Sequence, residues 1–353
     1  MVIPITTASL SSRRRLPSVL ILCTLTIVAV ATGCSRMTGP SAEPSATQSP
    51  RSAGPFGGEP AITIPADARA MGSFLKAQVA SNEGDRSEAL KDFAESVRYD
   101  PNNAQLRLKL ATLYVQDGEL QKAREQIQRA IAGDPRSVEA RLLAAGIDTA
   151  TGDDSGAERE YQEALKLDPK NQQAYIYLGT IYAKRGDYKK AGEIFEQLIA
   201  LQPNSFLGYY YAGRVMVAAG NYAEADKYYQ KALELNQQQE LVLIDVAVLR
   251  EIQGKPQEAI VYYKKITAIN PNNELVRKRL AELYAGQKNY DQALGELRRL
   301  ESMQTNASDT RTKIGLLYYE QGDLNNAATE FNLVLGSEPA NYKVRYYLGA
   351  AYA

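Results

Sequence analysis

The most reactive side chains in this sequence are two thiols, Cys23 and Cys34. The 353 residues include no histidine, the side chain that most often shuttles protons or binds metals near neutral pH. A zinc cluster of cysteines and histidines and the usual hydrolase triads are therefore excluded. The carboxylate pair Asp153-Asp154 remains, but it follows a glycine at an expected helix start, where acids favour the helix dipole. We predict that the protein is not an enzyme and that it needs no cofactor or metal.

The charge of the chain argues against nucleic acid as a partner. Lysine and arginine together number 41, as do aspartate and glutamate. Removing residues 1–33, which carry three arginines and no acid, leaves 38 basic against 41 acidic residues, a net charge of −3. A mildly acidic body has no electrostatic reason to bind nucleic acid or anionic lipid. The basic run Arg277-Lys278-Arg279 is interpreted as a solvated helix face.

Cys34 ends an apolar stretch near the amino terminus. Arg13, Arg14 and Arg15 precede the 14 residues from Ser18 to Ala31. A helix needs about 20 apolar residues to span a bilayer, and the shorter stretch is typical of a secretory signal. The alternative is an uncleaved membrane anchor. A disulfide is not expected, because Cys23 lies in the segment that would be removed.

The sequence Ala31-Thr32-Gly33-Cys34 resembles a bacterial lipoprotein signal, although Ala31 stands where leucine is commonest. The resemblance implies that residues 1–33 are a signal peptide, cut before Cys34, and that a lipid such as palmitate is attached to the Cys34 thiol. Ser35, in place of aspartate, implies by the same resemblance an outer-membrane protein that faces the periplasm. Two or three acyl chains would hold it there almost permanently.

Residues 34–69 are rich in proline, serine and glycine and contain no sustained apolar pattern. Proline removes backbone donors, and small polar side chains cannot form a core. We expect a disordered tether that acts as a passive spacer between the lipid and a folded body.

From residue 70 onward, four residue types recur every 34 residues. One series is of glycines: Gly84, Gly118, Gly152, Gly186, Gly220, Gly254 and Gly322, with Lys288 in the missing place. A second is of alanines: Ala89, Ala123, Ala157, Ala191, Ala225, Ala259, Ala293 and Ala327. A third, four residues later, is large and apolar: Phe93, Ile127, Tyr161, Phe195, Tyr229, Tyr263, Leu297 and Phe331. The fourth is of prolines: Pro101, Pro135, Pro169, Pro203, Pro271 and Pro339.

This pattern resembles the tetratricopeptide repeat, whose period is also 34 residues. The resemblance implies an all-α fold, a right-handed α-solenoid of helix-turn-helix units. Eight units occupy residues 70–341, and residues 342–353 match the first helix of an incomplete ninth. Because that last segment is apolar where terminal units are usually polar, we expect the chain to continue beyond residue 353.

Each series has a physical reason. Glycine ends the first helix of a unit because a left-handed C-cap costs it little. The Asp or Asn that follows most of these glycines suits the start of the next helix. A small residue lets two helices approach closely, and the large residue one turn later fills the space between helices. Proline stops the second helix.

The first helices are expected to line the surface that binds a peptide or partner helix. Residues predicted to face it occupy the second, fifth, sixth and ninth places of each first helix. We predict a partner-contact cluster of Tyr177, Tyr210, Tyr211 and Arg214, because tyrosine and arginine are favoured at binding hot spots. The alternative is that some of these tyrosines belong to the core between units or to unengaged surface. The lysine/asparagine clamp of chaperone-binding relatives is not supported, since no ninth place holds asparagine.

The hypothesis for function is a membrane-anchored scaffold that binds protein or peptide partners in the cell envelope. Similar repeat lipoproteins support pilus assembly, secretion, polysaccharide export or insertion of outer-membrane proteins. The alternative is a regulatory adaptor that recruits a periplasmic protease or a cell-wall enzyme. The membrane contact would be through the lipid anchor, and no nucleic acid or small-molecule substrate is expected.

Overall fold

The computed structural model describes residues 65–304 and 307–353. The predicted signal peptide, Cys34 and nearly all of the predicted tether lie outside these residues. The segment from Ala66 to Ala353 is one unit in terms of its internal contacts. Every regular element in the described ranges is an α-helix, and the predicted all-α solenoid of helix-turn-helix repeats is confirmed.

The helices alternate between the first and second helix of successive units. The first helices are α1 (Ala66–Glu83), α3 (Ala104–Gln116), α5 (Val138–Ala150), α7 (Gln172–Lys184), α9 (Phe206–Ala218), α11 (Glu240–Ile252), α13 (Glu274–Gly286), α15 (Ser308–Gln321) and α17 (Tyr342–Tyr352). The second helices are α2 (Arg86–Tyr99), α4 (Leu120–Gly133), α6 (Asp154–Leu167), α8 (Tyr188–Leu201), α10 (Tyr222–Leu235), α12 (Pro256–Ile269), α14 (Tyr290–Met303) and α16 (Leu324–Ser337). The first helix begins at Ala66, ahead of the expected start at residue 70, because no breaker follows Pro65 until Gly84.

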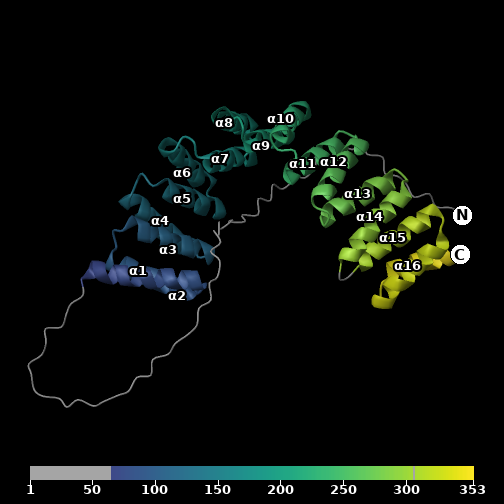
Figure 1. The fold of residues 1–353 in the computed structure, drawn as a ribbon, viewed down its shortest axis with the longest axis horizontal. Helices are drawn as coiled ribbons and strands as arrows, with labels where there is room; N and C mark the ends of the chain where they lie inside the picture. The colour runs from purple at the N-terminus through teal and green to yellow at the C-terminus, as the bar shows by residue number, and fades with distance from the viewer. Residues whose placement is uncertain (1–64, 305–306) are drawn as a thin grey trace, which may run out of the picture. The chain divides into compact units, whose positions relative to one another are not determined.

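Each helix packs mainly against its neighbours in the chain, so the units stack in order from α1 to α17 (Figure 1). First helices of adjoining units also touch one another: α3 touches α5, α9 touches both α7 and α11, and α15 touches α17. We call the side of the stack that is lined by these helices the first-helix face. Among the residues described, no helix is both long enough and apolar enough to cross a membrane.

The turn between the two helices of a unit has the geometry that the glycine series predicts. All seven glycines of the series have a positive φ, between 71° and 84°. Lys288, which replaces glycine in the seventh unit, has φ 59° and is the non-glycine residue with positive φ in the described ranges. The left-handed region is disfavoured for residues with a Cβ, so the backbone at Lys288 is strained.

The residues after these glycines cap the second helices. In five units the side chain accepts a hydrogen bond from the backbone N–H three residues on: Asp85, Asp153, Asp187, Asn221 and Asp323. Asn289 occupies the same position but makes no such bond, so the predicted cap is only partly realised there.

The core forms where a small residue of the first helix meets a large residue of the second. Ala89 and the other alanines of the series are fully buried. On the facing helix, Gly213 packs so closely against Tyr229 that a Cβ added to the glycine would lie 2.6 Å from the ring. Gly179 and Gly315 are equally close to Phe195 and Phe331. The small and large series are therefore matched surfaces, and added bulk on the small side requires the ring to move.

The interpretation of Arg277-Lys278-Arg279 as one solvated face is wrong for Arg277, which is 5% exposed. Its Nε donates to the backbone carbonyl of Pro271 at 2.7 Å, and its Nη1 pairs with Glu296 Oε2 at 2.6 Å. The guanidinium thereby ties the inter-unit turn to the second helix. Arg107, five units earlier in the same place, makes the same bond to Pro101. The signal was available in the sequence as a further series with the same period.

Candidate partner-binding face

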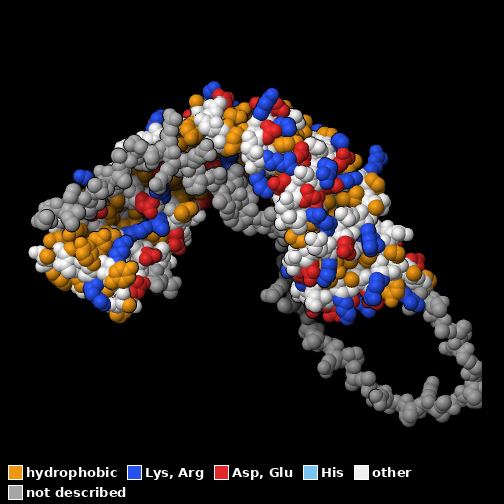
Figure 2. Space-filling model, turned by 180° about the vertical axis from the view of Figure 1, so that it is seen from behind, with side chains coloured by type: hydrophobic (Ala, Val, Ile, Leu, Met, Phe, Trp, Pro, Cys, Tyr) orange, Lys and Arg blue, Asp and Glu red, His pale blue; other side chains and the backbone are white. Residues whose placement is uncertain are grey.

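Large apolar side chains are exposed at the first-helix face. Leu241 on α11 is 59% exposed and Leu275 on α13 is 72% exposed, and both occupy the second place of their helix. Met71 and Leu75 on α1 and Val248 on α11 are also exposed. Around such side chains, acidic and basic residues are interspersed over the visible surface rather than sorted by sign (Figure 2). Exposed apolar side chains that recur on one face indicate a surface for contact with another molecule.

Tyr177 and Tyr211, two residues of the predicted contact cluster, extend the aromatic core toward this face. The Tyr177 ring stacks on Tyr161, with centroids 5.6 Å apart and planes 16° apart. The Tyr211 ring stacks on Phe195 in the same way, at 5.5 Å and 14°. Both tyrosines are half-buried, so one side of each ring packs on the core residue of the preceding second helix. Their role in partner contact remains a prediction.

Tyr210, by contrast, is a core residue that is 5% exposed. It packs edge-on against Tyr211 at 5.1 Å and also contacts Tyr229. The fifth place of α9 is directed toward α10 rather than out of the face, and the sequence pattern alone leaves these two directions open. Little of the Tyr210 ring is available to a partner.

Arg214 joins this aromatic group to the next unit. Its guanidinium lies 5.7 Å from the Tyr210 ring centroid, and its Nε lies 3.6 Å from Asp245 Oδ2 on α11. Burial raises the pKa of Asp245, while Arg214 and the hydroxyls of Tyr210 and Tyr229 act in the opposite direction. Three of the four predicted residues are therefore gathered around a carboxylate that was not predicted, and Tyr177 stands on α7, against Tyr161.

A chain of ion pairs crosses the first-helix face from α11 to α15. Glu251 on α11 pairs with Arg279 on α13, and Arg279 Nη1 lies 3.0 Å from Glu282 Oε2. Glu282 in turn lies 3.7 Å from Lys313 Nζ on α15. The hydrogen bond to Glu251 raises the pKa of Arg279, although burial acts against it. The sequence analysis did not identify this chain, because its members come from three different units.

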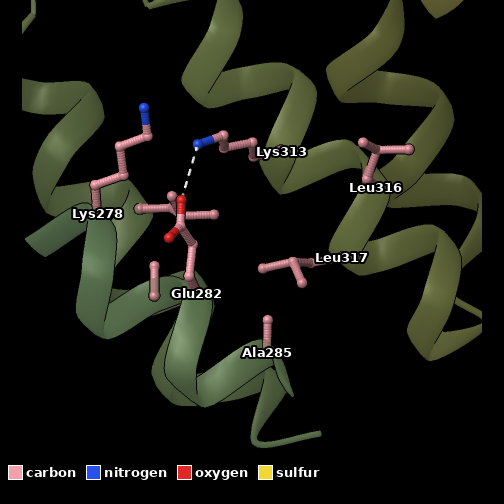
Figure 3. A pocket seen from close by; sticks show the side chains of 8 residues that line it. Lys278, Glu282, Ala285, Lys313, Leu316 and Leu317 are labelled. Atoms are coloured by element: carbon pink, nitrogen blue, oxygen red, sulfur yellow. Dashed lines mark ion pairs between the residues drawn. The ribbon is translucent and has the colours of Figure 1, made fainter. Parts of the chain in front are cut away.

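A pocket of about 220 Å³ opens beside this chain, between α13 and α15 (Figure 3). It is lined by Lys278, Ala281, Glu282, Ala285, Leu297, Lys313, Leu316 and Leu317. Lys278, Glu282, Lys313 and Leu316 all occupy places that were predicted to face the partner. In the ranges covered by the structure, no group of three or more acidic, cysteine or histidine residues is placed to hold a metal ion.

Comparison with known proteins agrees with this architecture. Family models described as tetratricopeptide repeat match residues 82–147, 150–206, 206–239, 252–310 and 308–341. No curated protein matches the sequence significantly.

Several solved structures are similar in fold. The crystal structure of the MamA protein is 26% identical and aligns over 48% of this chain and 93% of its own, with a TM-score of 0.46. PilF of Pseudomonas aeruginosa is 21% identical over 64% of this chain and 98% of its own, with a TM-score of 0.47. A tetratricopeptide repeat protein from Parabacteroides merdae is 17% identical over 81% of this chain and 99% of its own, with a TM-score of 0.42. On the repeat matches and the helical pairs described above, the chain belongs to the tetratricopeptide repeat family.

Proposed function

We propose that the protein is a membrane-anchored scaffold that binds protein partners in the cell envelope through its first-helix face. Tetratricopeptide repeats are interaction scaffolds, and this part of the proposal follows from the family. The observation that carries the choice of surface is the pair of exposed leucines, Leu241 and Leu275, at equivalent places on neighbouring first helices. A partner that covers both would remove apolar surface from water, which is the main favourable term in protein association.

The lipid anchor is supported by the sequence around Cys34. A tethered scaffold would hold its partners near the membrane and raise their effective concentration for one another. Support for assembly of an envelope system, such as a pilus, a secretion or polysaccharide-export system, or outer-membrane protein insertion, is the role that we favour for such a tethered array.

Partner capture tests the binding surface. We expect Leu241→Ser with Leu275→Ser to weaken recovery of crosslinked partners from living cells, with little change in melting temperature, because both side chains are exposed. A matched control is Val261→Ser with Leu333→Ser, which removes side chains that are 54% and 50% exposed on second helices. The same partners recovered in equal amounts with both double variants would contradict the proposed surface.

Fractionation tests the anchor separately. Cys34→Ala removes the thiol that would carry the lipid, so we expect the protein to lose its acyl label and most of its place in the membrane fraction. Cys23→Ala is the matched control, because it alters the other thiol within the segment that would be cleaved. Membrane retention of the Cys34→Ala protein without acylation would refute lipid anchoring and leave the binding surface untouched.

A further inference from the structure

The pocket between α13 and α15 has an apolar part and a polar part. Leu316, Leu317 and Ala285 lie at one side of it, whereas the ends of the Lys278, Lys313 and Glu282 side chains lie at the other (Figure 3). Its volume of about 220 Å³ is below the roughly 300–1,000 Å³ typical of sites for whole small molecules. The pocket is therefore suited to one apolar side chain rather than to a cofactor.

The polar part carries an excess of positive charge. Glu282 is shared between Arg279 at 3.0 Å and Lys313 at 3.7 Å, and Arg279 also pairs with Glu251. Lys278 forms no ion pair with any residue in the described ranges, so three cations face two carboxylates. Burial lowers the pKa of Lys313, and the adjacent Lys278 ammonium lowers it further. A further carboxylate beside the two lysines would relieve this repulsion.

We propose that this pocket receives the apolar side chain of a partner segment and that Lys278 and Lys313 bind the carboxylate of an acidic residue beside it. The inference rests on the proposed function, because it assigns one anchor point within the same first-helix face. Arg279 and Glu282 already pair with each other and with neighbouring helices, so they fix the rim rather than bind the partner.

The carboxylate is that of an aspartate or glutamate side chain within a continuous segment rather than a chain terminus. Leu275 lies one turn before Lys278 on α13, and Leu241 repeats its place on α11. Exposed apolar surface thus continues from the pocket onto the neighbouring unit. A segment that uses both would pass over the pocket and not end in it.

Methyl NMR of the full-length protein tests the pocket directly, because it detects weak binding at known positions. The probe is acetyl-Leu-Glu-amide at millimolar concentration, compared with acetyl-Leu-Gln-amide and acetyl-Ser-Glu-amide. We expect saturable shifts of the Leu316 and Leu317 methyl groups with the first peptide. The second should bind about two- to fivefold more weakly, as expected for a partly exposed ion pair. The third should bind more weakly still, because it lacks the apolar side chain.

Variants separate the two parts of the pocket. Lys278→Met keeps the apolar stem and should reduce affinity for the Leu-Glu peptide about two- to fivefold. Lys109→Met, an exposed lysine at the sixth place of α3, is the control and should change nothing. Ala285→Leu fills the apolar part and should abolish the shifts while the other methyl signals keep their positions.

Three results would overturn the inference. These are no saturable shift at Leu316 and Leu317, equal affinity for the Leu-Glu and Leu-Gln peptides, and tighter binding of acetyl-Ala-Leu with a free terminal carboxylate. If the methyl signals are silent but Leu241→Ser with Leu275→Ser still reduces partner capture, the pocket fails and the scaffold function stands. If that double variant captures partners normally, the proposed face fails whatever the peptides do.

Discussion

Replacing Lys288 by glycine should stabilise the seventh unit. At φ 59°, Lys288 adopts the conformation that glycine provides at φ 71–84° in the seven other complete units. A side chain in this region costs roughly 1–2 kcal/mol, and the greater freedom of glycine in the unfolded chain returns about 0.5–1 kcal/mol of that. The expected net gain is therefore about 0.5–1 kcal/mol. Lys288 is exposed and forms no side-chain contact with any described residue, so little else changes.

Hydrogen exchange is the appropriate assay, because long repeat arrays can depart from two-state unfolding and a single melting curve averages over units. We expect amide exchange in α13 and α14 to slow by about two- to fivefold in Lys288→Gly, and exchange in α3 and α4 to stay as it was. The matched control is Lys255→Gly, at the N-cap of α12, where φ is −112° and no left-handed strain exists to be relieved. Unchanged or faster exchange in α13 and α14 would refute the assignment of strain to Lys288.

Three further substitutions test the packing, the buried charge and the pH dependence. Gly213→Ala should destabilise its unit by about 1–3 kcal/mol in thermal melts, since the added methyl meets a buried ring; Gly349→Ala, with nothing within 4 Å, should not. Arg277→Met should cost about 3 kcal/mol, because a buried carboxylate loses its partner, whereas the exposed Lys278→Met should cost little; equal effects would contradict the buried role. Burial raises the pKa of Asp148, so ionisation of this group lowers stability as pH rises through its folded pKa. The melting temperature of Asp148→Asn relative to the native protein should therefore be higher at about pH 7 than at about pH 4, and the opposite trend would exclude this linkage.

The repeat period predicts most of the fold because each series of residues answers to a local requirement. A glycine that must adopt a positive φ, a cap that must accept a hydrogen bond and a small residue facing a large one can each be read from a single unit. Lys288 shows the limit of this logic, since its place in the series forces a conformation that its residue type disfavours. The fold follows the series as a whole rather than the propensity of one residue.

The candidate site was less predictable, because it depends on contacts between units. The fifth place of α9 is buried at Tyr210, yet the fifth place of α13 is exposed at Lys278, although the pattern assigns both to the same face. The difference lies in the neighbours: a large ring on α10 packs against Tyr210, and charged residues surround Lys278. Arg277, one residue earlier, is buried because a backbone carbonyl and a carboxylate lie within its reach. Such choices depend on three-dimensional neighbours that one unit does not contain.

Site-specific photo-crosslinking in living cells tests most directly whether partners bind the first-helix face. A photoreactive phenylalanine at Leu275 would sit on that face, and one at Val261 would sit equally exposed on a second helix. The account predicts crosslinks to discrete envelope proteins from Leu275, lost when Leu241 is changed to serine, and none from Val261. Crosslinks from Val261 to the same proteins, with Leu275 silent, would contradict it.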